Sequence, residues 1–116
     1  MNNTQNTLLW LDDARDPFDT EIDWLVFSPI GRNVEVKWVK DYDEFVNYIN
    51  EFGIPNGICF DHDLGDGKTG YDCVNWLIEY CMDNNCDFPP TGFQSANPVG
   101  RENMMKKIEN FRNIWK

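Results

Sequence analysis

Three aspartates directly follow two short apolar runs and could hold a metal ion. Asp12 and Asp13 come after the apolar residues 8–11, and Asp61 comes after residues 58–60. If both runs are parallel strands of one sheet, their carboxyl ends meet at the edge where open α/β sheets bind ligands. Carboxylates gathered there repel one another unless a cation neutralises them or some are protonated, and all-oxygen ligation suits Mg²⁺ or Mn²⁺. The alternative is that these acids are solvated residues that end strands in an acidic protein.

The loop after Asp61 carries further side chains that could act in catalysis or bind a metal ion. His62 lies between Asp61 and Asp63, and neighbouring carboxylates favour the charged imidazolium, which suits general-acid catalysis. A structural hydrogen-bond partner is the other interpretation of His62. Asp63, Asp66 and the glycines after them resemble part of an EF-hand loop, but the required glutamate is absent and a strand precedes the loop. The signal for a calcium loop is therefore weak.

Other polar residues stand where helices are expected to begin and could meet a phosphate. Thr69 precedes an apolar helical pattern over residues 70–82, where free backbone N–H groups attract anions. Thr69 could instead simply cap that helix. Ser95 and Asn97 end a fourth expected strand, and Arg101 follows at the start of the last helix. The alternative for this segment is a turn that only starts the helix.

The order of the apolar patterns predicts a single α/β domain over residues 1–116. Residues 1–7 are polar and are expected to form a frayed tail. Alternation of strands with helices at this spacing argues for a parallel sheet with right-handed crossovers. The segment 21–27 could be a short helix or an irregular apolar stretch. Strands are expected over 8–11, 34–39, 58–60 and 91–95, and helices over 42–52, capped by Asp41 and Glu44, over 70–82, and after Gly100.

Composition limits the partners and the setting. The chain has 20 acidic and 10 basic residues and a net charge of −10, so passive binding of duplex nucleic acid is not expected. No apolar run approaches the ~18–20 residues of a membrane span. Four cysteines without CxxC spacing, and no basic-then-apolar N-terminus, indicate free thiols in a reducing, cytoplasmic setting. Zinc bound through Cys81 and Cys86 is an alternative, although His62 is the only histidine.

Four stretches together resemble the cyclic-phosphate processing receiver domains, a family with the CheY-like receiver fold. They are residues 9–17, 60–65, 69–72 and 95–104. The resemblance implies a three-layer, flavodoxin-like fold with a short, mostly parallel four-stranded sheet of order 2-1-3-4. It also implies Mg²⁺ or Mn²⁺ at the acidic edge and action on cyclic phosphates, in settings that include RNA repair and phage or conflict systems.

The resemblance also assigns roles by position. Asp12 and Asp13 would hold the metal, Asp61 would be a ligand or the phosphoacceptor equivalent, and Ser95 would contact phosphate. Gln94 stands where the family usually has histidine, and the fifth strand with the phosphate-binding lysine of signalling receivers is missing, which argues against phosphorelay. The family's motifs also include positions that signalling receivers lack. In this chain those positions are occupied by His62, Asp63, Arg15, Asn97 and Asn103.

Three functions therefore remain open. The first is a metal-dependent phosphoesterase that acts on a cyclic phosphate or on a phosphate of a nucleotide or RNA end, with Asp61, His62, Asp63 and Arg15 as the catalytic group. In it, Thr69, Ser95, Asn97, Arg101 and Asn103 bind the phosphate or the rest of the substrate. The second is a phosphoacceptor at Asp61. The third is a non-catalytic module that binds a ligand, a partner protein or a second copy. We favour the first.

Overall fold

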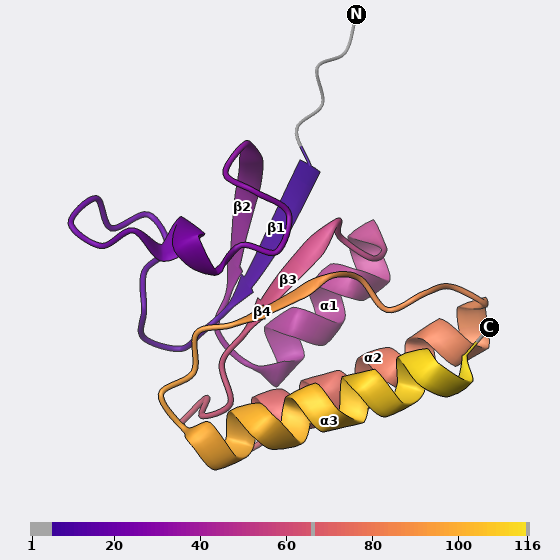
Figure 1. Ribbon diagram of the computed structural model, residues 1–116. Coiled ribbons are helices and arrows are strands. Elements are labelled where there is room, and N and C mark those ends of the chain that lie inside the picture. The colour runs from indigo at the N-terminus through magenta and orange to yellow at the C-terminus, as the bar shows by residue number, and fades with distance from the viewer. Residues whose placement is uncertain (1–5, 66, 116) are drawn as a thin grey trace, which may run out of the picture.

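Figure 1 shows the computed structural model of the protein, which describes residues 6–65 and 67–115. The described residues form four strands and three α-helices that alternate along the chain, with one short 3₁₀-helix in the first connection. In chain order the elements are β1 (Asn6–Leu11), η1 (Trp24–Phe27), β2 (Val34–Val39), α1 (Tyr42–Phe52), β3 (Gly57–Phe60), α2 (Gly70–Asn84), β4 (Thr91–Phe93) and α3 (Pro98–Ile114).

The sheet has the predicted order, β2-β1-β3-β4, and all three strand pairings are parallel. Parallel pairing brings the carboxyl ends of the strands to one edge of the sheet, as the sequence motifs require. β1 begins earlier than predicted, because Asn6 and Thr7 pair with β2 and the Thr7 N–H donates to Asn56 Oδ1 at 2.8 Å. Those two residues therefore belong to the sheet rather than to a tail, and residues 1–5 lie outside the described residues.

The two faces of the sheet are covered unequally. The three α-helices lie on one face, and the connection between β1 and β2 lies on the other (Figure 1). Leu9 and Leu11 of β1 are fully buried in the core under the helices. Trp10 belongs to a smaller cluster on the opposite face, where the half-buried Trp24 of η1 packs against it with ring centroids 5.7 Å apart. The ambiguous segment 21–27 thus contains a 3₁₀-helix that covers the sheet and forms the thin third layer.

Two other boundaries differ from the sequence-based expectation. β4 ends at Phe93 rather than at Ser95. Gln94 N–H still donates to Phe60 O of β3 at 3.2 Å, but the Ser95 hydroxyl accepts from Asn97 N–H at 3.1 Å and starts a turn. At the other boundary, α2 continues two residues beyond the predicted end and stops at Asn84, where Asn85 takes a left-handed conformation with φ of 53°.

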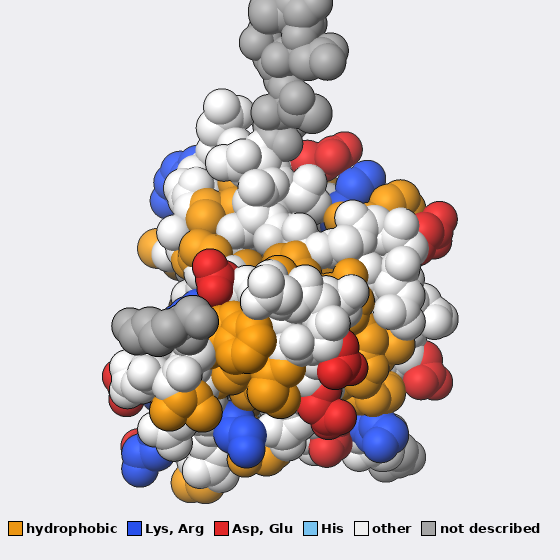
Figure 2. Space-filling model, turned by 90° about the vertical axis from the view of Figure 1, so that its right-hand side faces the viewer, with side chains coloured by type: hydrophobic (Ala, Val, Ile, Leu, Met, Phe, Trp, Pro, Cys, Tyr) orange, Lys and Arg blue, Asp and Glu red, His pale blue; other side chains and the backbone are white. Residues whose placement is uncertain are grey.

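The surface carries mixed charge. On the face drawn in Figure 2, hydrophobic side chains lie between acidic and basic ones, and the basic side chains do not merge into one surface. None of the helices in the described ranges has the length and apolar character to cross a membrane.

Candidate functional site

Three carboxylates meet at the carboxyl ends of β1 and β3, as the sequence predicted. Asp12 and Asp61 directly follow these strands, and the Asp61 N–H donates to Leu11 O at 3.0 Å, which keeps the two strand ends in register. One carboxylate oxygen from each of Asp12, Asp13 and Asp61 lies within 4.8 Å of the others. Asp12 and Asp61 are buried, whereas Asp13 is exposed. Within residues 6–65 and 67–115 this is the group whose side chains could hold a metal ion.

The side chain of Asp12 is held in place by its own loop. Its Oδ1 accepts hydrogen bonds from the backbone N–H groups of Ala14 at 3.0 Å and of Arg15 at 2.8 Å. Aspartate often forms such turns with N–H groups a few residues ahead. The backbone carbonyl of Asp12 in turn accepts from the Trp38 indole N–H at 2.8 Å. The orientation of this carboxylate is therefore fixed by the protein itself, which preorganises the site.

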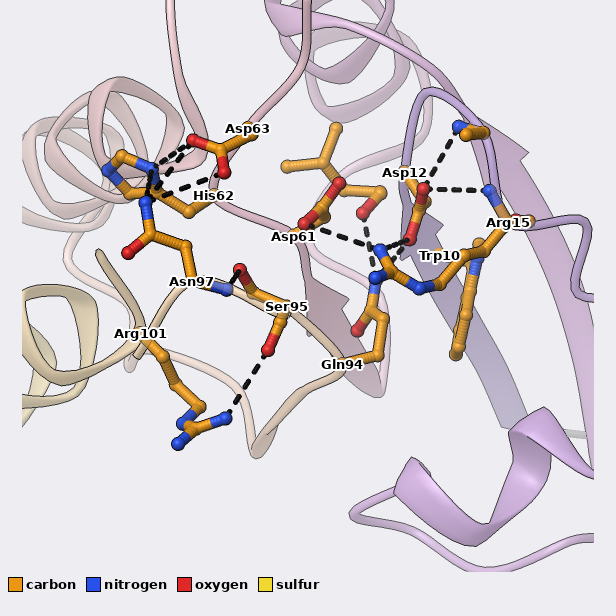
Figure 3. Close-up of polar contacts among 12 residues, drawn as sticks. Trp10, Asp12, Arg15, Asp61, His62, Asp63, Gln94, Ser95, Asn97 and Arg101 are labelled. Carbon is orange, nitrogen blue, oxygen red and sulfur yellow. Dashed lines mark hydrogen bonds and ion pairs between the residues drawn. The ribbon is translucent and has the colours of Figure 1, made fainter. Parts of the chain in front are cut away.

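Arg15 lies between the two buried acids. Its Nη1 is 3.3 Å from Asp12 Oδ2 and 3.7 Å from Asp61 Oδ1 (Figure 3). The Arg15 carbonyl accepts from the Trp10 indole N–H at 3.0 Å, and the guanidinium carbon lies 5.9 Å from the ring centre of Trp24. Arg15 thus supplies positive charge to both buried carboxylates from a position fixed by two tryptophans.

The acids around Asp61 are not fully neutralised by Arg15. Burial, and then the negative charge of Asp12, raise the pKa of Asp61 from 3.8 to about 6, and Asp13 adds to this effect. The charge of Arg15 and a hydrogen bond from Ser95 act in the opposite direction without cancelling it. Three oxygen donors with residual negative charge suit a hard divalent cation, so the residues fit Mg²⁺ or Mn²⁺.

His62, Asp63 and Asn97 form a second polar group beside the acids. His62 Nδ1 lies 2.9 Å from Asp63 Oδ1, and Asn97 Nδ2 lies 3.4 Å from both Asp63 oxygens and 3.5 Å from His62 Nδ1. The hydrogen bond with His62 is the main cause that lowers the pKa of Asp63. Figure 3 shows Asp61 between this group and the Asp12–Arg15 pair. The predicted catalytic residues therefore form two neighbouring groups.

The imidazole of His62 packs against the first turn of α3. Asn97 caps this helix, with its Oδ1 accepting from Gly100 N–H at 2.9 Å. A Cβ atom added at Gly100 would overlap the His62 ring, because no side chain fits between the helix and the imidazole. The absence of a side chain at Gly100 therefore sets the position of His62.

Replacing Gly100 by alanine is expected to destabilise the protein by about 1–3 kcal/mol, since an extra methyl group forces a packed side chain or backbone to move. Urea unfolding measures the loss, and the neighbouring Val99→Ala, at an exposed helix position, is the matched control. Equal stability of the Gly100→Ala and Val99→Ala proteins would contradict the packing described here.

The predicted phosphate-binding residues are placed differently from one another. Ser95 is buried beside Asp61, and the Ser95 carbonyl accepts from Arg101 Nη1 at 3.3 Å. Thr69 caps α2 in a capping box with Asp72, as one of the two interpretations of this residue predicted. Asn103 is exposed on α3, and its side chain forms no hydrogen bond to another residue in the described part of the chain. Ser95 and Arg101 are thus placed together, whereas Asn103 stays apart.

Gln94 contributes a contact that sequence reasoning missed. Its Nε2 donates to Leu11 O at 2.9 Å and lies 3.5 Å from Asp12 Oδ2, so a side chain following β4 reaches across the end of β3 to β1. Gln94 Oε1 is buried without a hydrogen-bond partner in the described residues. The signal available in the sequence was that Gln94 stands where the family usually has histidine. An amide here can hold Asp12 but cannot transfer protons as an imidazole would.

The parallel sheet of order 2-1-3-4, with an acidic triad at its carboxyl edge, defines a receiver-like domain. More narrowly, the chain belongs to the family described as the Cyclic-phosphate processing Receiver domain, whose match covers residues 7–110. This confirms the resemblance noted in the motifs.

One of two similar solved structures supports the fold. A fusion protein that carries a trimeric coiled-coil segment of yeast Spc42 is similar with a TM-score of 0.62 and 18% identity, over 89% of this chain and 62% of that one. The response regulator PhyR from Brucella abortus has a TM-score of 0.48 and 21% identity, over 95% of this chain and 51% of its own. The chain therefore spans less than two thirds of either protein. Among curated proteins, none matches.

Proposed function

We propose that this protein is a metal-dependent phosphoesterase that opens a cyclic phosphate on a nucleotide or an RNA end. The observation that carries the proposal is the cluster of Asp12, Asp13 and Asp61, whose oxygens lie within 4.8 Å of one another. Membership of the cyclic-phosphate processing receiver family supports the substrate class. The chain's net charge of −10 makes a local cation the economical way to attract a phosphate.

The residues of the acidic edge would bind the cation and the phosphate. A divalent ion held by the three aspartates would supply Lewis-acid polarisation of a phosphate oxygen and activation of water. Arg15 lies beside the same acids, and its planar guanidinium suits charge that develops on the phosphate. Arg101 and the N–H groups that begin α3 offer a second place for phosphate oxygens, next to the buried Ser95.

His62 is the proposed proton donor. Opening a cyclic phosphate adds the hydroxyl of water to phosphorus, breaks one ester bond, and requires a proton on the released oxygen. Asp63 contacts His62 Nδ1 at 2.9 Å, which orients the ring and leaves Nε2 to deliver the proton. Asn97 lies close enough to hold this pair in orientation, and the first turn of α3 packs against the ring.

The test is hydrolysis of 2′,3′-cyclic and 3′,5′-cyclic nucleotides with Mn²⁺ or Mg²⁺, followed by phosphorus NMR of the products. We expect monoester product, a loss of at least about 100-fold in rate for Asp61→Asn, and a similar loss for His62→Gln. The control Asp43→Asn removes an exposed acid in the first turn of α1 and should keep the activity.

Other outcomes assign the site to the remaining functions. Absence of turnover with either metal would overturn the phosphoesterase proposal. A mass increase of one phosphate at Asp61 after treatment with acetyl phosphate would instead indicate a phosphoacceptor. Stoichiometric retention of the cyclic nucleotide without conversion would indicate a binding module. Turnover that Asp61→Asn leaves unchanged would place the chemistry outside the acidic edge.

A further inference from the structure

β4 leaves one side of its backbone without a partner strand. It is an edge strand of the sheet and, within the described residues, pairs with β3 alone. Ile58 N–H donates to Pro90 O, and Gln94 N–H donates to Phe60 O, so alternate residues of this segment bond to β3. Because successive peptide groups of a strand face opposite sides, the N–H and C=O groups of Thr91 and Phe93 face the open edge. Four backbone hydrogen-bonding groups are thus available there.

A groove runs along this open edge beside α3. It has a volume of about 810 Å³, and its lining includes Thr91 and Phe93 together with Met105 and Ile108 of α3. Met105 is 49% exposed, so part of its apolar surface is open to a ligand in the groove. The groove therefore combines an apolar wall with unpaired backbone groups, which is what an added strand requires.

The charges along the groove favour an acidic occupant. The guanidinium group of Arg101 donates to the backbone carbonyl of Ser95, and that of Arg112 donates to the carbonyl of Pro89. Neither side chain forms an ion pair with a carboxylate in the described residues. Of the two glutamates in the lining, Glu102 is paired with Lys106 at 3.0 Å, which leaves Glu109. The groove is thus locally basic on a chain whose net charge is −10.

We propose that β4 accepts an extended peptide of another protein, with two acidic side chains that meet Arg101 and Arg112. These arginines are eleven positions apart on one helix, or roughly 16 Å at 1.5 Å per residue. An extended chain covers that distance in roughly five residues, and side chains on one face recur at every second residue. The partner segment therefore carries acidic residues four or six positions apart, with an apolar residue between them that enters the groove beside Met105.

The probe is the synthetic peptide acetyl-Thr-Glu-Thr-Val-Thr-Glu-Thr-amide, added to ¹⁵N-labelled protein. We expect chemical-shift changes and slower hydrogen exchange at the Thr91 and Phe93 amides. Arg112→Gln should weaken binding by ~5-fold or more, as loss of a charge-assisted hydrogen bond does. The matched control Arg32→Gln removes an exposed arginine that is paired with Asp23 elsewhere and should bind normally. Far-UV circular dichroism verifies that both variants are folded.

Two further peptides test the mode of binding. A peptide with lysine in place of both glutamates should fail to bind, and so should one with N-methyl groups on the central valine and the threonine after it, because either strand direction needs one of those N–H groups. Equal binding by either peptide would overturn the proposal. A concentration-dependent dimer that Arg112→Gln abolishes would also overturn it, because the occupant would then be a second copy of this chain. The same amide shifts with a single-stranded oligonucleotide would overturn it as well.

Discussion

The metal-free Asp61→Asn protein is expected to be more stable than the wild type at neutral pH, by about 1–3 kcal/mol. The pKa of Asp61 is raised from 3.8 to about 6 in the folded protein, mainly because burial and the charge of Asp12 disfavour its ionised form. The ionised carboxylate therefore destabilises the folded state relative to the unfolded chain. Asparagine has nearly the same shape and avoids that cost.

The contribution of Asp61 to the free energy of unfolding depends on pH. Below pH 3.8 Asp61 is protonated in both states, whereas between pH 3.8 and about 6 the folded protein holds this proton and the unfolded chain releases it. This contribution to the free energy of unfolding is present at low pH and is lost as the pH rises to about 6. The pKa of Asp63 is lowered, so Asp63 titrates below this range and is common to both proteins.

Urea unfolding in EDTA at several pH values, with Asp43→Asn as the control for charge, measures the difference. We expect the gap between Asp61→Asn and the wild type to open between about pH 4 and 6 and then stay constant. A wild type that becomes relatively more stable over that range would show that the Asp61 pKa is lowered rather than raised.

The fold followed from the sequence where local chemistry decided the structure. Four apolar runs separated by helical patterns were sufficient to predict the parallel sheet, whereas its strand order was implied by the resemblance to the receiver family. Asp41 caps α1 as predicted by accepting from Glu44 N–H at 2.8 Å, because a capping residue acts within one turn. The start of β1 was missed because Asn6 and Thr7 are polar, and only pairing with β2 makes them part of a strand.

The candidate site was predictable to a similar degree. Acids that end neighbouring strands had to meet, so Asp12, Asp13 and Asp61 could be grouped before the structure was known. The bond from Gln94 to Leu11 could not, since it joins side chains and backbone 83 positions apart. Such contacts depend on how far one side chain reaches across the sheet, and no pattern in a single sequence encodes that distance.

Unequal covering of the sheet affects which groups can move at the site. The loop that holds Arg15 leads into the thin layer around η1, where Val26 is exposed. The His62 ring, in contrast, packs closely against Gly100 of α3. A ligand that draws Arg15 away from Asp12 would therefore shift a lightly packed segment, while His62 keeps its position. Any rearrangement on binding is expected in residues 13–33 rather than in α1, α2 or α3.

Mn²⁺ is expected to raise the thermal stability of the wild type and to have no such effect on Asp12→Asn. A ligand that binds only the folded protein adds about 2.7 kcal/mol when its concentration is 100 times the dissociation constant. Asp12 is fully buried and fixed by two backbone N–H groups, so an amide in its place removes one negatively charged ligand without a substitute nearby. Glu21→Gln, at an exposed position of the following loop, is the matched control.

The same experiment repeated at lower pH separates specific binding from a general ionic effect. A proton and Mn²⁺ compete for Asp61, whose pKa is about 6, so the apparent affinity should fall by nearly tenfold for each pH unit below that value. Binding to scattered surface acids would persist to about pH 4, where ordinary carboxylates begin to protonate. Stabilisation of Asp12→Asn equal to that of Glu21→Gln, or an affinity that stays constant down to that pH, would place the ion away from the acidic edge.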